Sequence, residues 1–310
     1  MKRIGNLFEK ICEKDNIILA ENIASKGKST QRNVIKHKLN YEENIGELEN
    51  MLRNKTYTTS GYKNFSIKEK GKMRDISSLP FFPDRIVQHA VMNVLEPIFV
   101  STYTSNTYSC IKGRGVHKAS FRLRKHLKEE NYKYCLKIDI KKFFPSIDNQ
   151  ILKDLLRKKF KDEDLLWLLD DIIDSTKGLP IGSYVSQYFS NFYLTYFDHW
   201  VKEDLNVGAY LRYCDDMIFL ANSKEELWYW FSKIRDYLES NLKLEVKSNY
   251  QVFPIEVRGI DWCGYKHFKD YTLIRKSTKK NYKRNKNKKN HYGWLKHCNS
   301  VNLRNKYENN

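Results

Sequence analysis

Residues 211–220 decide the fold and read LRYCDDMIFL, so that two adjacent aspartates, Asp215 and Asp216, interrupt a run of apolar and aromatic residues. This pattern predicts a β-hairpin with an acidic tip. Two neighbouring carboxylates on a rigid turn repel each other. A divalent cation relieves that repulsion, because Mg²⁺ is usually held by one or two carboxylates together with substrate phosphates. Asp-Asp is also simply a good turn former, so this stretch alone leaves a structural and a functional interpretation open.

A third aspartate ends another apolar strand. Residues 134–148 read YCLKIDIKKFFPSID. The alternation of a strand places Leu136, Ile138 and Ile140 on one face, with Asp139 on the other. A lone acid in this position, followed by two aromatic residues, could hold a metal ion beneath a nucleotide. The alternative is an aspartate that caps the following turn.

Three further stretches combine cations with glycine. Residues 64–68 and 75–79 predict two strands joined by KGKMR, which could bind a triphosphate through Lys and Arg or be a solvated turn. Residues 108–118, YSCIKGRGVHK, predict a basic loop before a helix, which could grip a phosphate backbone or merely be a turn. Residues 176–187, TKGLPIGSYVSQ, predict a Gly/Pro loop that enters a long helix.

The composition indicates a nucleic-acid partner. The chain has 310 residues, a formal net charge of +19 and 41% hydrophobic residues, which suits a globular protein and not a disordered one. So large a surplus of positive charge implies a polyanionic partner, most simply nucleic acid. From residue 266 onward there are fourteen Lys or Arg against two acids. Within this region, residues 276–289 predict either a nucleic-acid contact or disorder.

The six cysteines show no C-x-x-C spacing, so neither a zinc site nor a disulfide framework is expected. Together with the absence of a signal peptide, this favours a cytoplasmic location. No apolar run approaches 18 residues, so we expect no membrane span. Helical spacing predicts helices in residues 1–60, with a polar loop over Glu21–Gln31, and residues 242–247 and 259–266 predict strands.

Four motifs in this order resemble a reverse transcriptase: the basic strand pair, the strand ending at Asp139, the Gly/Pro loop and Tyr-Cys-Asp-Asp. The resemblance covers about residues 68–265. It implies an α+β right-hand polymerase fold with fingers, a palm of antiparallel sheet and helices, and a small helical thumb. It divides the chain into an N-terminal helical extension (1–60), fingers and palm (61–265) and a basic C-terminal thumb or tail (266–310).

The same resemblance implies an RNA-directed DNA polymerase that works by two-metal nucleotidyl transfer. Asp139 and Asp215 would bind two Mg²⁺ ions, with Mn²⁺ as a possible substitute, and Ile140 belongs to the same metal site. Asp216, the third catalytic acid, would support the primer end. Two such ions clamp the attacking 3′-oxygen and the leaving pyrophosphate oxygen of an in-line displacement.

Further roles follow from the resemblance alone. Phe144 falls at the steric-gate position that selects deoxynucleotides, and Lys247 occupies the place of a lysine thought to protonate pyrophosphate. Trp262-Cys263-Gly264-Tyr265 resembles the primer grip. The implied nucleotide-binding residues are Lys72, Arg74, Phe144, Ile181, Gly182, Gln187 and Lys247. The implied nucleic-acid-binding residues are Lys112, Arg114, Gly264, Tyr265, Lys279, Lys280, Lys283 and Arg284.

One departure from the family pattern bears on the subfamily. Most reverse transcriptases have Gln-Gly ending in Ser-Pro in the loop before the long helix, whereas residues 181–187 read IGSYVSQ. This variant resembles the bacterial and phage reverse transcriptases of diversity-generating retroelements, within the group II intron-like superfamily. These enzymes copy template RNA into cDNA from deoxynucleotides while mutating adenines, and work with a small basic accessory protein. Ile181 cannot make the hydrogen bonds of a glutamine, so looser discrimination between base pairs is physically sensible.

Two alternatives stay open. One is a retron-like or phage-defence reverse transcriptase of similar size, with an antiviral role. The other, from a different class, is a catalytically silent RNA-binding module that kept the fold. The joint presence of Asp139, Asp215 and Asp216 argues against a silent module, because three neighbouring acids are costly to keep without a function.

Overall fold

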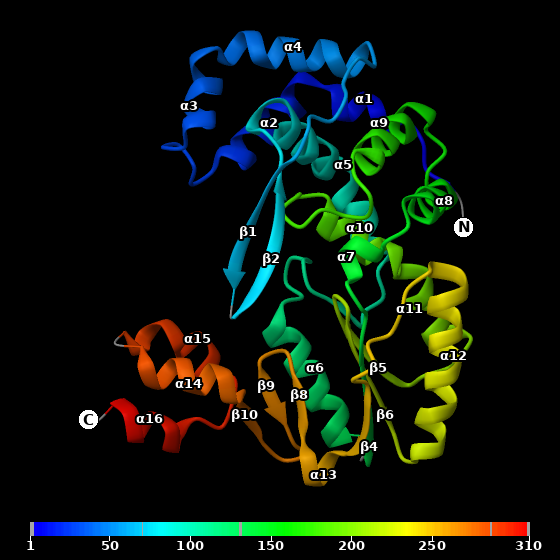
Figure 1. Cartoon of the computed structure of the whole chain (residues 1–310), viewed down its shortest axis with the longest axis vertical. Helices are drawn as coiled ribbons and strands as arrows, with labels where there is room; N and C mark the ends of the chain where they lie inside the picture. Colours follow the sequence, from blue (N-terminus) through cyan, green and yellow to red (C-terminus); the bar gives the residue numbers. More distant parts are fainter. Residues whose placement is uncertain (1–2, 70, 130–131, 286, 309–310) are drawn as a thin grey trace. The chain divides into compact units, whose positions relative to one another are not determined.

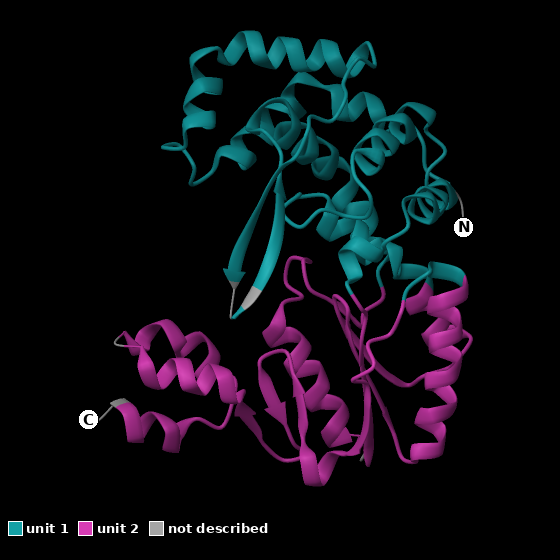
Figure 2. Ribbon diagram, viewed as in Figure 1, with its two compact units in different colours: residues 1–103, 142–196, 241–244 teal, residues 104–141, 197–240, 245–310 magenta. Residues whose placement is uncertain are grey.

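The computed structural model describes residues 3–69, 71–129, 132–285 and 287–308. The chain forms two compact units, shown in different colours in Figure 2. Unit 1 contains residues 1–103, 142–196 and 241–244, and unit 2 contains residues 104–141, 197–240 and 245–310. The chain therefore passes several times from one unit to the other, and each unit combines segments that are distant in sequence.

Unit 1 begins with four helices, as the helical spacing of residues 1–60 predicts (Figure 1). Their apolar residues form one buried face; Phe8 and Ile11, for example, are almost fully buried. The expected loop over Glu21–Gln31 is wrong in part, because α2 continues to Ser25 and Glu21 is fully buried. Lys38 compensates the Glu21 carboxylate, with 3.1 Å between Nζ and Oε2. The helices are α1 (Phe8–Cys12), α2 (Lys14–Ser25), α3 (Arg32–Leu39) and α4 (Tyr41–Arg53).

The expected basic strand pair follows as an antiparallel hairpin. Its strands are β1 (Lys63–Glu69) and β2 (Lys72–Ser78), and Lys63 of β1 lies opposite Ser78 at the end of β2. The expected turn over residues 70–74 is wrong in part, because residues 72–74 pair with β1 as the start of β2. A short kinked segment, η1 (Phe81–Arg85), in which Phe82 has an extended backbone (φ −108°, ψ 133°), then leads into α5 (Ile86–Thr102), which packs against α2. The remaining helices of unit 1 are α7 (Phe143–Ser146), α8 (Asn149–Lys159), α9 (Glu163–Asp174) and α10 (Ser186–Tyr193).

The long helix expected after residue 185 is divided into α10 and α11 (Thr195–Glu203), with Leu194 between them. Helix α10 buries its apolar side chains, and Phe189 and Phe192 are fully buried. Helix α9 begins at Glu163, where the Asp162 carboxylate accepts a hydrogen bond from the Leu165 N–H.

Unit 2 is built on a five-stranded sheet in the order β3-β5-β6-β4-β7. Helix α6 (Val116–Glu129) packs against β3 and β5, and its Leu123 and Leu127 join the apolar core with Leu211 and Ile218 of the sheet. A further helix, α12 (Lys224–Leu242), follows the sheet's central hairpin. The strands are β3 (Thr107–Tyr108), β4 (Tyr134–Asp139), β5 (Ala209–Tyr213), β6 (Asp216–Ala221) and β7 (Gln251–Pro254).

The C-terminal part of unit 2 departs from the predicted elements. The strand expected over residues 259–266 is a hairpin of two strands, and that over 242–247 is reduced to one bridge between Ile140 and Val246. The stretch with predicted nucleic-acid contact or disorder begins as a helix, α14, because Tyr282 anchors it in a small core with Ile274 and Leu295. The elements are α13 (Ile255–Arg258), β8 (Ile260–Trp262), β9 (Tyr265–His267), β10 (Thr272–Ile274), α14 (Lys276–Arg284), η2 (Lys288–His291), α15 (Tyr292–Leu295) and α16 (Val301–Glu308).

Among the described residues, no helix has both the length and the apolar character needed to cross a membrane.

Candidate active site

The acidic stretch forms the hairpin that the sequence predicts, with a two-residue turn. Strands β5 and β6 pair up to Tyr213 and Asp216, so Cys214 and Asp215 make the turn and Asp216 is the first residue of β6. Cys214 adopts φ +58°, a left-handed conformation that costs free energy in a residue other than glycine. The strained backbone of Cys214 therefore fixes the position of Asp215.

Strand β4 brings the third aspartate to the same place. In the antiparallel β4–β6 pair, Asp139 lies directly opposite Asp216. The next residue, Ile140, donates its N–H to the carbonyl oxygen of Asp215 at 3.3 Å. Opposite residues of an antiparallel pair have Cβ atoms about 4.5–5.5 Å apart. The structure thus gathers the three aspartates of the predicted site in one corner of the unit 2 sheet.

The electrostatics of this corner are unfavourable for the protein alone. Burial raises the pKa of Asp215, and the neighbouring charge of Asp139 raises it further. Burial likewise raises the pKa of Asp216 to about 6, although Lys137 opposes the shift. Within the described part of the chain, the buried Oδ1 of Asp216 has no hydrogen-bond partner. These carboxylates are held where their ionised forms repel each other and one oxygen is left without a donor.

This arrangement fits a divalent cation. The described residues contain no group of three or more His, Cys, Asp or Glu side chains placed to hold a metal ion. Mg²⁺, however, is usually bound by one or two carboxylates together with substrate phosphates and water. Asp139 and Asp215 would supply the carboxylates. A cation there would remove the repulsion that raises the pKa of Asp215.

Lys247 lies in the same corner. Its ammonium group forms an ion pair with Asp139 Oδ1, and both side chains are partly exposed. Its N–H donates to the Asp139 carbonyl at 2.8 Å, beside the single bridge of Ile140 and Val246. Lys247 is therefore tied to Asp139 through both its backbone and its side chain.

Sequence reasoning missed Lys137, which contacts one of the three carboxylates, that of Asp216. Its Nζ lies 3.3 Å from Asp216 Oδ2 and donates to the Asp261 carbonyl at 2.7 Å. The signal was present, since residues two apart on a strand share a face and Lys137 stands two before Asp139.

Sequence reasoning also missed the buried ion pair of Arg212 and Asp198, close to the β5–β6 turn. The side chains of Arg212 and Asp198 are both fully buried. Arg212 Nε donates to Asp198 Oδ1 at 2.8 Å, and its Nη1 donates to the Cys214 carbonyl at 2.9 Å. Tyr210 and Thr107 add hydroxyl hydrogen bonds to Asp198, at 2.7 and 2.9 Å. The sequence signal was an arginine within an apolar strand, without any indication of its partner.

Apart from Lys247, which belongs to unit 2, the residues expected to bind the incoming nucleotide belong to unit 1. Arg74 is exposed on β2; Lys72 lies on the same strand, but its side chain is outside the described part. Phe144 is half-buried in α7, and its carbonyl accepts the Leu179 N–H at 2.9 Å. Their position relative to the aspartates of unit 2 stays a prediction.

The Gly/Pro loop is attached to the base of the β1–β2 hairpin. The carbonyl of Ile181 accepts the Ser77 N–H at 2.9 Å. Gly182 adopts φ +118°, and a Cβ on it would lie 2.8 Å from the Ser77 carbonyl oxygen, so only glycine fits there. Ile181 is half-buried, and Gln187, also in the predicted set, is exposed at the start of α10.

The expected nucleic-acid contacts fall into three groups. In the Gly-punctuated loop, Lys112 is exposed, whereas Arg114 donates to the Thr104 carbonyl at 2.9 Å and so also shapes the loop. In the segment that resembles a primer grip, Gly264 lies in the β8–β9 turn with φ +82°, and Trp294 packs against it. Tyr265 is fully buried with its hydroxyl 2.9 Å from His117 Nδ1, which fits a role in supporting this turn better than direct contact with a strand.

Helix α14 presents the remaining predicted cations. Its four members, which are all exposed, are Lys279, Lys280, Lys283 and Arg284. Lys279 also lines a pocket of about 860 Å³ that extends to Asp139 within unit 2. The other cations of this pocket are Lys137, Arg258, Lys266, Arg275 and Lys276.

Solved structures of low sequence identity share the fold. The structure of apo telomerase from Candida tropicalis truncated from its C-terminal domain matches with a TM-score of 0.55 and 13% identity, over 76% of this chain and 60% of that one. The longer apo telomerase from the same organism matches with a TM-score of 0.52 and 14% identity, over 68% of this chain and 48% of that one. The expected α+β right-hand polymerase fold is confirmed.

Curated relatives match at the sequence level. Protein YkfC from Escherichia coli K12 is 26% identical over 226 residues, 68% of this chain and 53% of YkfC. The retron Ec73 reverse transcriptase from Escherichia coli is 33% identical over 174 residues, 51% of this chain and 52% of the relative. The group II intron-encoded protein LtrA from Lactococcus lactis is 27% identical over 52% of this chain and 29% of LtrA. The chain thus spans about half the length of YkfC and the retron enzyme.

The family model described as "Reverse transcriptase (RNA-dependent DNA polymerase)" matches residues 63–267, about two thirds of the chain. The matched segment contains the β1–β2 hairpin, the Gly/Pro loop and all three aspartates. The chain belongs to the reverse transcriptase family.

Proposed function

We propose that this protein copies an RNA template into cDNA by transfer of deoxynucleotides to a primer end. The observation that carries the proposal is the corner of the unit 2 sheet where Asp139 faces Asp216 and Asp215 sits on the adjoining turn. These partly buried carboxylates repel one another, which would favour the binding of divalent cations. Membership of the reverse transcriptase family supports this assignment.

The residues of this corner would divide the work as follows. Asp139 and Asp215 would hold Mg²⁺ or Mn²⁺, with Ile140 as part of the same site. When bound, two such ions stabilise the attacking and the leaving oxygen of an in-line displacement. Asp216, placed opposite Asp139, orients the primer end. Lys247 carries a proton on Nζ next to Asp139 and donates it to the departing pyrophosphate.

The basic pocket of unit 2 supports a path for a nucleic-acid strand. It runs from Asp139 to Lys279 on α14, and most of its charged lining is cationic. Lysine and arginine side chains bind phosphates largely without regard to sequence. A primer or template backbone in this pocket would bring the strand end to the aspartates.

The finer proposal is that synthesis is error-prone opposite template adenine. It rests on Ile181, whose backbone is hydrogen-bonded to Ser77 at the base of the β1–β2 hairpin and whose side chain is half-buried. A branched apolar side chain there offers no hydrogen bond to a base pair, so a mismatch is rejected less strongly. A structured template RNA and a small basic accessory protein complete this proposal as partners.

One comparison favours a second candidate within the same enzyme class. The retron Ec73 reverse transcriptase is 33% identical over half of this chain. A retron-like or phage-defence enzyme would copy its RNA faithfully, so fidelity distinguishes the two candidates.

Primer extension on a defined RNA template, with Mg²⁺ and all four deoxynucleotides, tests the proposal. Sequenced products with frequent errors opposite adenine support the mutagenic role, and faithful products assign the enzyme to the retron or defence group. Ile181→Gln should lower the error frequency roughly tenfold, equivalent to about 1.4 kcal/mol of discrimination. Ile181→Val, which stays branched and apolar, serves as the matched control. No product, even with candidate partners added, would favour the silent RNA-binding module instead.

A further inference from the structure

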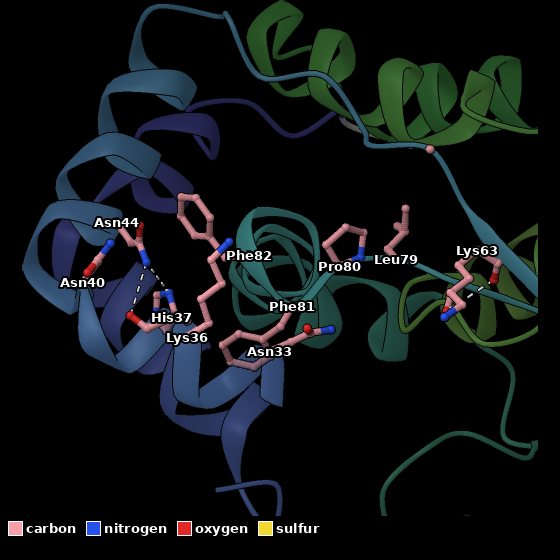
Figure 3. A pocket seen from close by; sticks show the side chains of 12 residues that line it. Asn33, Lys36, His37, Asn40, Asn44, Lys63, Leu79, Pro80, Phe81 and Phe82 are labelled. Atoms are coloured by element: carbon pink, nitrogen blue, oxygen red, sulfur yellow. Dashed lines mark hydrogen bonds between the residues drawn. The ribbon is translucent and has the colours of Figure 1, made fainter. Parts of the chain in front are cut away.

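Unit 1 contains a pocket of about 540 Å³, and none of the predicted site residues lines it (Figure 3). It lies between α3, the start of α4, the base of the β1–β2 hairpin and the segment that leads into η1. Ligand pockets in proteins typically have volumes of about 300–1,000 Å³. The size is therefore suitable for one small molecule or one unit of a polymer.

The polar lining combines amides with cations. Asn33, Asn40 and Asn44 supply amides, and Lys36 and Lys63 supply positive charge. Among the described residues that line the pocket, none is acidic. Amides can donate and accept hydrogen bonds at the edge of a heterocycle, whereas ammonium groups bind phosphate as point charges. This lining suits a ligand that has both a hydrogen-bonding edge and a negative charge.

The apolar lining forms a rigid aromatic surface. The rings of His37 and Phe82 are stacked, with centroids 5.6 Å apart and planes inclined by 22°. Asn44 Nδ2 donates to His37 Nδ1 at 3.0 Å. Burial lowers the pKa of His37. Pro80 and Leu79 continue this surface toward Lys63 (Figure 3).

We propose that this pocket binds one nucleotide of a single-stranded RNA, with the base against Pro80 and Phe82 and the phosphate at Lys36 and Lys63. Single-stranded RNA is recognised by stacking of bases on rings together with hydrogen bonds to their edges. The proposal deepens the proposed function, because the RNA would be the template or its flanking sequence. Lys63 is the first residue of the hairpin that carries Arg74, so RNA held here would be attached to the fingers.

The first experiment measures RNA affinity of the whole chain. A fluorescein-labelled single-stranded RNA of about 20 nucleotides, without deoxynucleotides present, is titrated with protein and followed by fluorescence anisotropy. We expect Lys36→Gln combined with Lys63→Gln to weaken binding roughly tenfold and to lower the slope of log K against log salt by about 1.4, since each phosphate contact on a single strand contributes about 0.7. Phe82→Leu should weaken binding about fivefold through lost stacking.

A matched control removes the same charge from the same unit. Lys10 on α1 and Arg32 on α3 are exposed and do not line the pocket. Lys10→Gln combined with Arg32→Gln should change affinity by no more than about twofold. Equal losses in the two double variants would overturn the proposal, because the effect would then be one of net charge alone.

Three further measurements identify the ligand. RNA containing 4-thiouridine should crosslink to the peptides around Lys36 and Phe82, and crosslinks confined to other peptides would contradict the proposal. Competition by free AMP or dATP at micromolar concentration would make this a site for free nucleotides and overturn the assignment to RNA. Equally tight, pocket-dependent binding of single-stranded DNA would overturn the preference for RNA.

Primer extension separates this inference from the proposed function. Pocket-dependent RNA binding in a chain that makes no cDNA would support the pocket and refute the polymerase. A chain that makes cDNA and whose pocket variants bind RNA normally would refute the pocket alone.

Discussion

Asp198 and Asp216, two acids near the β5–β6 turn, differ in how many hydrogen-bond partners the chain gives their carboxylates. Asp198 is fully buried and fully paired, with Arg212, Tyr210 and Thr107 as its donors. Asp216 is also mostly buried, yet its Oδ1 has no partner among the residues that the structure describes, and its pKa is raised to about 6. A buried acid with a structural role receives its counter-charge from the chain. An acid with a functional role keeps an oxygen without a partner in the chain, and a ligand can bind there.

The two groups are connected through the turn itself. Arg212 binds Asp198 with one part of its guanidinium and the Cys214 carbonyl with another. The paired site therefore fixes the strained backbone that presents Asp215. The Arg212–Asp198 ion pair stabilises the fold and so offsets the free-energy cost of the acidic turn. Substitutions should separate the stability due to the ion pair from the cost of the turn.

The largest expected effect is on activity. Asp215→Ala should reduce primer extension by at least about 10³-fold, because a bound metal ion contributes several kcal/mol to the transition state. The free energy of unfolding should stay the same or rise, since burial raises the pKa of this carboxyl and its removal relieves that cost. Activity assays and urea denaturation measure the two effects. Asp270→Ala, an exposed acid of the same unit, should leave both unchanged.

The next effect is on stability. Arg212→Met should lower the free energy of unfolding by about 3–5 kcal/mol, because it leaves Asp198 buried without a counter-charge. Adding Asp198→Leu should recover most of this loss, since neither charge then remains. Urea denaturation of the wild type, both single variants and the double variant completes the cycle. A double variant as unstable as Arg212→Met would show that the pair does not act as a unit.

A smaller effect depends on pH. The pKa of Asp216 rises from 3.8 for an ordinary aspartate to about 6 in the folded protein. Ionisation is thus less favourable in the folded state, and this group's contribution to stability is full below pH 3.8 and lost as pH rises to about 6. Asp216→Asn should therefore stabilise the metal-free protein by about 1–3 kcal/mol at pH 7.5 and have no effect below pH 4.

Thermal denaturation at both pH values, with and without Mg²⁺, measures this difference. Excess Mg²⁺ should stabilise the wild type more than Asp216→Asn. A stabilisation of the same size at pH 3.5 and pH 7.5 would mean that the ionisation of Asp216 is not its cause.

The three aspartates of the candidate site could be predicted from the sequence because they interrupt or end apolar stretches. Asp139 and Asp215 stand where a strand ends, and the strand pattern itself indicates that such ends can meet. Lys137 could have been found by the same alternation. Asp198 could not, because nothing local pairs a helical aspartate with an arginine fourteen residues later, and only the packing of α11 on the sheet brings them together.

The remaining differences also arise from tertiary contacts. The polar stretch around Glu21 looks like a loop, but a salt bridge with Lys38 allows it to continue as a buried helix. The basic stretch after Ile274 looks unable to fold, yet Tyr282 alone gives α14 an apolar anchor. The pocket at Lys36 and Lys63 joins residues 27 positions apart, and no motif marks it.

The smallest expected effect concerns the residue that bridges the two kinds of site. Lys137, like Arg212, supplies a positive charge to an acid of the same unit. Its Nζ lies 3.3 Å from Asp216 Oδ2 and neutralises the charge of this candidate-site acid only in part. Lys137→Met should raise the pKa of Asp216 further and reduce primer extension roughly threefold to tenfold, with a higher Mg²⁺ concentration needed for half-maximal rate. Lys137→Arg, which keeps the charge, should retain most activity. Because a partly exposed ion pair contributes at most about 1 kcal/mol, the stability of both variants should stay close to that of the wild type. A large loss of stability in Lys137→Met would show that Lys137, like Arg212, is a structural partner of its acid. Asp216 would then resemble Asp198, and the proposed difference between the two acids would be wrong.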